Sequence, residues 1–341
     1  MNHLSFRCLV FTAVLCLWLP HPAAAQNFKI ATIAPEGSDW MKDMRAGADA
    51  IEKSTQGRVT FKFYGGGVQG NDKQVQRKMR TGQLHGAAFT SGGMGLFQHD
   101  SDILSLPLLF NDNEEARFIR DHVEAELRQR LEDAGYVNFG FAAAGFAYMM
   151  STRPIRTSAD MNGQKVWVPE GDRASFDALQ ALGVAPVVMP VTDVLTGLQT
   201  DLLDCVAAPP VGAIVLQWHT RLAYITDMPL AYVYAALLIE KRAFQRMSAE
   251  DQAIVRHVME GIYRKFDRYG VADNDEAMQA LLDSGLKRVP PDPGQVAEWR
   301  RSVDRTFDAL AAEGGLDAEL LGRIRSLLES YRQGQGEPSS P

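Results

Sequence analysis

The sequence predicts an α/β protein built from two lobes that close on a cleft. Short apolar runs with strand character alternate with segments whose apolar residues recur at helical spacing. The chain has 341 residues, which is enough for two lobes with a core each. The predicted strands form two sets with chain crossings between them, and they cover residues 28–34, 59–64, 84–90, 136–142, 146–151, 164–169, 185–189, 202–207 and 232–239.

Capping residues mark where several predicted helices begin. Ser38 precedes a helical pattern, and Asn71 with Gln74 matches a capping box. Asp172 follows the strand at residues 164–169 and caps the next helix. Such a strand-to-helix junction is where α/β proteins place ligands. Further helical patterns cover residues 113–135, residues 248–282 as one long or kinked helix, and residues 296–330.

The N-terminus has the pattern of an export signal. Arg7 is its only charged residue, an apolar run follows at residues 8–19, and three alanines ending at Ala25 supply a cleavage pattern. The run is too short to span a bilayer, which argues against a membrane anchor. We therefore predict a signal peptide at residues 1–25, cleaved after Ala25, and a periplasmic mature protein. The polar tail at residues 331–341 is predicted to be disordered.

Composition and charge exclude several classes of function. After removal of the signal peptide the chain carries 34 basic and 42 acidic residues, a net charge of −8, which does not fit a nucleic-acid binder. No segment after residue 26 is long and apolar enough to cross a membrane. The turns at Gly65 and Gly92 lack the spacing of a phosphate-binding loop, and no cofactor is expected. Cys205 is the single cysteine left after cleavage, so no internal disulfide forms.

No catalytic or metal-binding motif stands out. The histidines lack metal-ligand spacing, and there is no GxSxG elbow for a serine nucleophile. Cys205 is better explained as a small buried residue than as a nucleophile. Glu170 and Asp172 would suit acid–base chemistry or a cationic ligand, but helix capping by Asp172 explains their spacing more simply. An exported α/β protein without a catalytic set favours binding over turnover.

Four stretches together resemble the solute-binding proteins of tripartite ATP-independent periplasmic (TRAP) transporters, of the dicarboxylate-binding type. They read GGGVQGNDKQVQRKMRTGQLHGA, LSLPLLFNDNEEAR, RPIRTSADMNGQKVWVP and PVVMPVTDVLTGLQTDLLD. The resemblance covers about residues 27–330. It implies a two-lobed α/β fold with a central ligand cleft, a long helix that links the lobes, and delivery of the solute to TRAP-type membrane permease subunits.

The resemblance also implies a carboxylate-binding pocket, which this sequence alters. The family's arginine, which holds a ligand carboxylate as a bidentate fork, corresponds to Trp167. A second arginine corresponds to Ala147, and the family's asparagine corresponds to Ala208. Without these groups a buried carboxylate would lack its cation, which costs several kcal/mol. The predicted pocket also includes Ile33, Thr90, Ser91, Met149, Val191 and Leu230.

These replacements predict a largely apolar or aromatic pocket rather than one for small dicarboxylates. Trp167 would form one wall of the pocket, or would fill the cleft and simply pack. Glu170 and Arg173 complete the predicted ligand-binding residues. Arg173 would hold an acid group from another direction, or would pair at the surface with Glu170 or Asp177.

Several functions stay open at this point. The leading hypothesis is a solute receptor for an apolar or aromatic ligand. A second is a receptor for an organic acid held through Arg173 or backbone groups. A periplasmic enzyme or an accessory envelope protein belongs to a different class. For the receptor, we predict lobe I from residues 26–147 with 231–272, and lobe II from residues 148–230 with 273–330.

Overall fold

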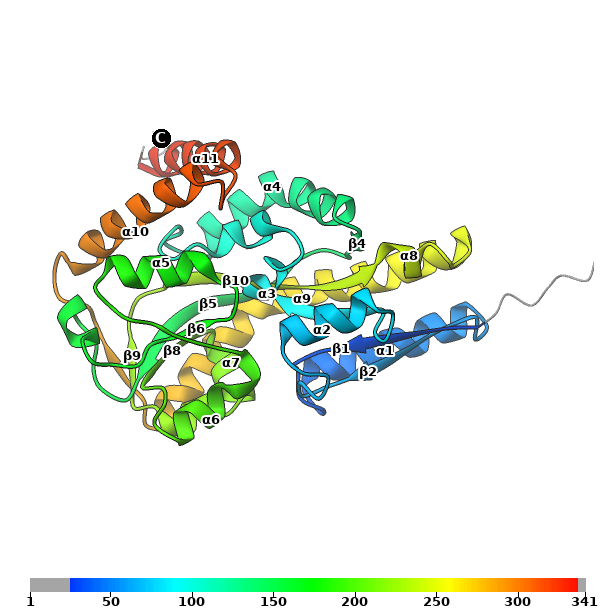
Figure 1. Cartoon of the computed structure of the whole chain (residues 1–341), viewed down its shortest axis with the longest axis horizontal. Helices are drawn as coiled ribbons and strands as arrows, with labels where there is room; N and C mark the ends of the chain where they lie inside the picture. Colours follow the sequence, from blue (N-terminus) through cyan, green and yellow to red (C-terminus); the bar gives the residue numbers. More distant parts are fainter. Residues whose placement is uncertain (1–24, 337–341) are drawn as a thin grey trace, which may run out of the picture.

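The computed structural model describes residues 25–336, which form two lobes of α/β structure with a long helix running between them (Figure 1). This is the architecture that the sequence predicts. The predicted signal peptide lies outside the described residues apart from Ala25, as do residues 337–341. None of the helices within residues 25–336 combines the length and the apolar character that a membrane span requires.

One lobe is built on three parallel strands, with β1 between β2 and β3. Their apolar side chains, such as Ile30, pack against α1 and the first part of the long helix α9. Ser38 caps α1 through the Met41 amide, and Asn71 with Gln74 forms the predicted capping box of α2. The elements are β1 (Gln26–Ala31), α1 (Asp39–Ser54), β2 (Val59–Tyr64), α2 (Asp72–Arg80), β3 (Gly86–Thr90), α3 (Ser91–Met94), the 3-10 turn η1 (His99–Ser105), α4 (Asn113–Asp133) and β4 (Tyr136–Val137).

Two long antiparallel strands, β5 (Ala142–Ser151) and β10 (Ala231–Glu240), pass from one lobe to the other. The first half of β5 pairs with β10, and its second half pairs with β8 and β9. The far end of β10 pairs with β3, so the main sheet runs in the order β11-β9-β5-β10-β3-β1-β2. The strand expected over residues 136–142 is only β4, because Gly140 takes a φ of 113° and separates it from β5.

The other lobe is built around the second half of β5 with β8 and β9, beside a small parallel sheet of β6 and β7. Asp172 caps α5 by accepting a hydrogen bond from the Ser175 amide at 2.9 Å, as predicted. The elements are η2 (Ser158–Met161), β6 (Trp167–Pro169), α5 (Arg173–Ala181), β7 (Val187–Met189), η3 (Val191–Asp193), α6 (Val194–Gln199), β8 (Cys205–Ala208), α7 (Pro210–Val215), η4 (Trp218–Arg221), β9 (Tyr224–Thr226) and β11 (Lys287–Val289).

The long helix α9 (Ala249–Asp283) follows the short helix α8 (Lys241–Phe244) and spans both lobes without a break. It begins at the predicted cap, Ser248. Gly270 lets the helix lie directly against β5, because a Cβ atom there would come within 2.2 Å of the Ala143 carbonyl oxygen. The helix is therefore seated on a strand that itself crosses between the lobes.

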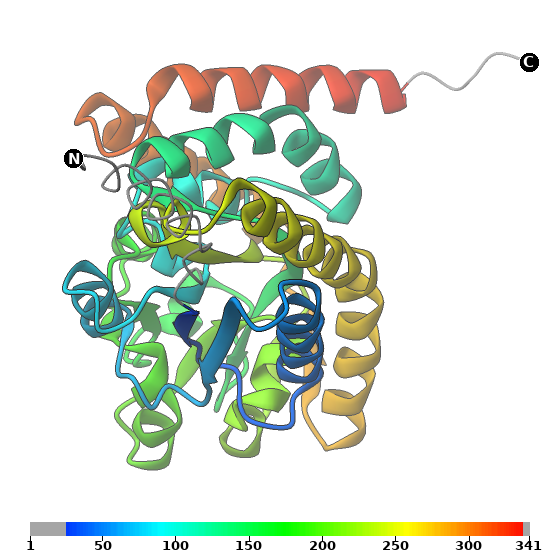
Figure 2. The same ribbon diagram turned by 90° about the vertical axis from the view of Figure 1, so that its right-hand side faces the viewer.

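The last two helices cover the outside of the molecule. α10 (Gln295–Ala312) packs on α5, and α11 (Ala318–Gly336) lies beside α4, as the red and teal helices of Figure 2 show. Arg332 of α11 forms an ion pair with the buried Glu115 of α4 at 2.7 Å. The helix therefore continues past residue 331, where the sequence predicted a disordered tail. The boundaries between the two lobes stay a prediction.

Candidate functional site

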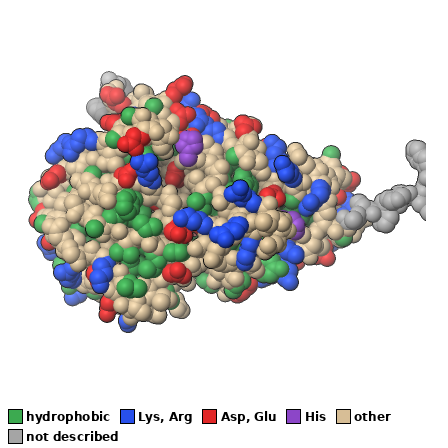
Figure 3. Space-filling view, viewed as in Figure 1, with side chains coloured by type: hydrophobic (Ala, Val, Ile, Leu, Met, Phe, Trp, Pro, Cys, Tyr) green, Lys and Arg blue, Asp and Glu red, His purple; other side chains and the backbone are tan. Residues whose placement is uncertain are grey.

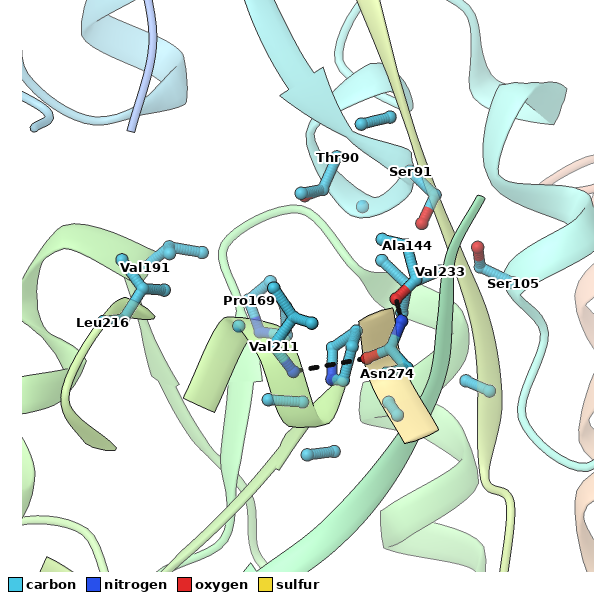
Figure 4. Close-up of a pocket in the computed structure, with 18 of the residues that line it drawn as sticks. Thr90, Ser91, Ser105, Ala144, Pro169, Val191, Val211, Leu216, Val233 and Asn274 are labelled. Carbon is cyan, nitrogen blue, oxygen red and sulfur yellow. Dashed lines mark hydrogen bonds between the residues drawn. The ribbon is translucent and has the colours of Figure 1, made fainter. Parts of the chain in front are cut away.

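A cavity of about 1230 Å³ lies between the lobes. Sites that enclose drug-sized ligands measure roughly 300–1,000 Å³, so there is room for a solute of that size. In Figure 4, Thr90, Ser91 and Ser105 lie on one side of the cavity, and Val191, Leu216 and Val211 lie on the other. On the face seen in Figure 3, hydrophobic side chains gather over the lobe that carries α5, α6 and α7.

Nine of the eleven predicted ligand-binding residues line this cavity. Thr90 and Ser91 stand where β3 ends and α3 begins, and Ala147 and Met149 belong to the crossing strand β5. None of the nine is charged. Their part in binding a ligand stays a prediction. The nine are Ile33, Thr90, Ser91, Ala147, Met149, Trp167, Val191, Ala208 and Leu230.

Trp167 is part of the cavity wall and of the protein core at once. Only 6% of its surface is exposed. The indole N–H donates a hydrogen bond to the Met189 carbonyl oxygen at 2.8 Å, which ties β6 to the end of β7. Its ring meets the Trp218 ring edge to face, with centroids 5.2 Å apart. The indole is thus fixed in one orientation, and the two predicted roles, forming a wall and packing, are combined.

Glu170 and Arg173 are not among the residues that line the cavity. Glu170 forms an ion pair with Lys73 of α2 at 3.3 Å, across from one lobe to the other. The Arg173 side chain is 61% exposed and pairs with Asp177 at 3.2 Å and with Glu313 at 2.6 Å. Arg173 therefore takes the surface role that the sequence left open, with Asp177 as one of its partners.

Two carboxylates line the cavity where their elements come close, Asp102 from η1 and Asp172 from the start of α5. The segments that carry them are neighbours, since a Cβ atom on Gly171 would lie 3.4 Å from the Leu96 side chain. Burial raises the pKa of Asp102 well above its usual range, and the neighbouring Asp172 carboxylate raises it further. Burial also raises the pKa of Asp172, while the Ser175 amide opposes the shift. Within residues 25–336 neither carboxylate has a cationic partner. The sequence predicts Asp172 as a helix cap and carries no local signal for Asp102.

Both lysines of the cavity lining are already paired. Lys42 forms an ion pair with Asp39 at 2.7 Å, and Lys265 forms one with Asp43 at 2.8 Å. Their two carboxylate partners, both on α1, also line the cavity. No arginine lines the cavity in the part of the chain that the structure describes. The cavity therefore offers no free guanidinium or ammonium to an acidic ligand.

Asn274 of α9 lines the cavity and connects the elements around it (Figure 4). Its side-chain amide donates to the Ala144 carbonyl oxygen at 2.5 Å and accepts a hydrogen bond from the Val211 amide at 3.2 Å. Gly145 is required beside it, because a Cβ atom at this residue would lie 2.3 Å from the Asn274 amide nitrogen. Asn274 thus joins α9, β5 and α7, a role that depends on tertiary contacts and has no local sequence signal.

The described residues offer little for catalysis. Between residues 25 and 336, no group of three or more His, Cys, Asp or Glu side chains is arranged to hold a metal ion. The Cys205 thiol is buried, which raises its pKa to about 12 and keeps it protonated at neutral pH. A buried thiol in this state is a poor nucleophile.

These features define a class of protein, a two-lobed solute receptor with its cavity between lobes that are joined by crossing strands and a long helix. Residues 30–313 match the family described as bacterial extracellular solute-binding protein, family 7, and the chain belongs to that family. The resemblance to TRAP solute-binding proteins is thereby confirmed. Its relatives are periplasmic transport proteins rather than enzymes.

Individual relatives agree with this assignment along most of the chain. The C4-dicarboxylate-binding periplasmic protein DctP of Rhodobacter capsulatus is 25% identical over 327 residues, which cover 93% of this chain and 96% of the relative. Two TRAP periplasmic solute-binding protein structures share the fold. One, from Xanthobacter autotrophicus Py2 with bound β-D-galacturonate, has a TM-score of 0.80 and 21% identity over 89% of this chain and 99% of its own. The other, from Desulfovibrio salexigens with bound orotic acid, has a TM-score of 0.79 and 18% identity, and the match likewise covers 89% of this chain and 99% of its own.

Proposed function

We propose that this chain is a periplasmic receptor that binds an apolar or aromatic solute between its lobes and delivers it to a TRAP-type membrane permease. The observation that carries the proposal is the lining of the cavity, which is mostly apolar and contains no arginine among the described residues. Trp167 occupies the position where the family resemblance implies an arginine. A small dicarboxylate in this cavity would lose its hydration without gaining a cationic partner.

Closure of the two lobes on the solute would link binding to delivery. A solute that contacts both walls stabilises the closed arrangement over the open one, because it gains contacts only when the walls approach. The strands β5 and β10 pass between the lobes and suit a hinge. The permease would then recognise the surface that the closed lobes present together.

A receptor for an organic acid is the second candidate, because the solved relatives hold acids such as galacturonate and orotic acid. In this chain the acid would need Arg173 or backbone groups as its partners. Arg173 faces away into ion pairs with Asp177 and Glu313, which weakens this candidate.

The direct test is to identify the solute that the protein carries. The mature protein is purified from the periplasm without unfolding and analysed by native mass spectrometry, with and without extraction of small molecules. We expect a retained solute with a ring or a branched apolar skeleton, and we expect its return to the emptied protein to raise the Tm. Recovery of a small dicarboxylate or sugar acid would favour the second candidate instead.

Replacing Trp167 tests the assignment of the cavity wall. We expect Trp167→Arg to weaken binding of the retained solute at least tenfold, because the flat apolar wall is replaced by a charged side chain. Trp167→Phe is the matched control, since it keeps an aromatic wall and loses the hydrogen bond to Met189. Circular dichroism and Tm establish that each variant is folded. Unchanged binding in folded Trp167→Arg would contradict the assignment.

A further inference from the structure

The charge of the cavity lining narrows the chemistry of the solute. Six carboxylate residues and two lysines line the cavity, which leaves four carboxylates in excess once the two lysine pairs are set aside. In the residues that the structure describes, no arginine or histidine adds positive charge to this lining. The carboxylates are Asp39, Asp43, Asp102, Asp172, Asp273 and Glu276.

Asp102 is the clearest of the unpaired carboxylates. No other described residue donates a hydrogen bond to its side chain, and its backbone is the only group that stabilises the charge. Packing explains why it is confined, since a Cβ atom on Gly95 would lie 3.0 Å from one of its oxygens. A confined carboxylate that faces a cavity without a partner is costly to the empty protein. Its acceptor capacity is available to a ligand.

Asp172 lines the same cavity as Asp102 and accepts hydrogen bonds from the Ser175 amide and side chain, which use only part of its acceptor capacity. The two carboxylates come from different lobes as we predict them, so a cation between them would contact both. Aromatic rings belong to the same lining, among them Trp167 and Trp218, which contact each other. Carboxylates together with aromatic walls are the groups that hold organic ammonium ions in proteins.

We propose that the solute carries a positive charge, as the protonated amine of an apolar or aromatic compound does, and that Asp102 and Asp172 receive this charge from the two sides of the cavity. The proposal rests on the proposed function, since it names the chemical class of the solute for the same site. The apolar lining holds the skeleton of the solute, and the carboxylate pair orients its amine. An anionic solute of the same skeleton is repelled.

The test uses a panel of aryl-alkyl and cycloalkyl-alkyl amines, each with the alcohol and the carboxylic acid of the same skeleton. Binding to the emptied, full-length mature protein is measured by thermal shift and by calorimetric titration. We expect the amines to bind more tightly than their alcohols and acids. We expect Asp102→Asn to weaken amine binding about tenfold or more, because a charge-assisted hydrogen bond becomes a neutral one.

Two further variants control for structure and for charge. Asp172→Asn keeps a good helix N-cap, so loss of amine affinity in this variant reports the carboxylate and not the start of α5. Asp49→Asn makes the same charge change at an exposed residue of α1 that does not line the cavity, and should leave amine binding unchanged. Equal loss in Asp49→Asn would show a general charge effect and overturn the assignment to the pair.

The outcomes separate this inference from the proposed function. If acids or alcohols bind as well as the amines, if no amine binds, or if the amine preference survives in Asp102→Asn, the cation inference is wrong. A retained solute that is neutral or acidic also overturns it, while the receptor function stands. If no compound binds and native mass spectrometry finds no retained solute, the proposed function fails with it.

Discussion

Asp100 and Asp102 lie two residues apart on η1, yet their surroundings are opposite. Asp100 is 1% exposed, pairs with Arg130 at 2.7 Å and accepts a hydrogen bond from the Asp317 amide at 2.9 Å. Asp102 lines the cavity, where Asp172 raises its pKa, and no cationic side chain within residues 25–336 pairs with it. The first carboxylate joins three parts of the chain. The second is partly buried and has no such partner among the described residues.

This difference separates carboxylates that stabilise the fold from carboxylates that remain available to a ligand. A second like-charge pair supports the distinction, because burial and the neighbouring Glu170 together raise the pKa of Asp72 to about 6. Asp72 and Asp102 belong to predicted lobe I, and Glu170 and Asp172 belong to predicted lobe II. Carboxylates of the two predicted lobes therefore come close beside and within the cavity, where Glu170 also pairs with Lys73. A cationic solute would offset this repulsion when the lobes close, which couples the charge of the solute to closure.

Asp100→Ala gives the largest expected effect on stability. The substitution leaves the Asp317 amide without its acceptor and removes the buried partner of Arg130, so we expect a loss of about 3–5 kcal/mol in the free energy of unfolding. Urea denaturation at pH 7 measures it. Glu126→Ala is the matched control, since Glu126 also pairs with Arg130 at 2.7 Å but is 35% exposed. Its loss should stay near 1 kcal/mol or below. Equal losses in the free energy of unfolding of the two variants would contradict the distinction between buried and exposed partners of Arg130.

Asp102→Asn should act in the opposite direction. The variant removes a carboxyl whose pKa is raised by burial and by the neighbouring Asp172, so we expect the empty variant to be more stable than the wild-type protein at pH 7. The folded-state pKa of Asp102 is raised, and the wild-type protein therefore loses stability as pH rises from the unfolded-state pKa toward that folded-state value. The gain should be mostly lost near pH 3.5, where the Asp102 carboxyl is protonated in the folded protein and largely protonated in the unfolded chain. Urea denaturation at both pH values is the measurement. A destabilised variant at pH 7 would show that Asp102 is structural, as Asp100 is.

The local signals in the sequence were sufficient to place the starts of helices. Ser38, Asn71, Asp172 and Ser248 cap helices as predicted, because a cap depends on contacts within three residues. The prediction for the C-terminal tail was less accurate. Polar composition predicted disorder from residue 331, while Arg332 holds the last turns of α11 through an ion pair with a residue more than two hundred positions earlier.

The candidate site was predictable only where the family resemblance supplied positions. It indicated Trp167 and Ala147 as cavity residues, but no sequence pattern pairs Asp102 with Asp172. The two lie seventy residues apart and come together only when η1 and α5 approach from different lobes. Asn274 was missed for the same reason, since its three contacts join α9, β5 and α7. Such sites depend on tertiary structure and leave no periodic pattern.

Asp72→Asn tests the second like-charge pair, which Asp72 forms with Glu170. The rise in the pKa of Asp72 from 3.8 to about 6 corresponds to about 3 kcal/mol, because one pH unit is worth 1.36 kcal/mol. Asp72 also lies in the first turn of α2, where a negative charge is favourable by about 0.3–1 kcal/mol. We therefore expect Asn to stabilise the protein by about 2 kcal/mol at pH 7.5. The gain should fall between pH 6 and pH 4, as the wild-type carboxyl binds its proton. A gain that does not vary with pH would point to packing instead.

Arg173→Ala should have the smallest effect and bears on the choice between a cationic and an acidic solute. The Arg173 side chain is 61% exposed and its ion pairs with Asp177 and Glu313 lie outside the cavity, so solvent screens what the substitution removes. We expect an unchanged Tm and unchanged affinity for the retained solute, measured by thermal shift and titration beside Asp102→Asn. If Arg173→Ala loses affinity while Asp102→Asn does not, the cation in the complex belongs to the protein and the acid to the solute, which reverses the polarity that we assign to the cavity.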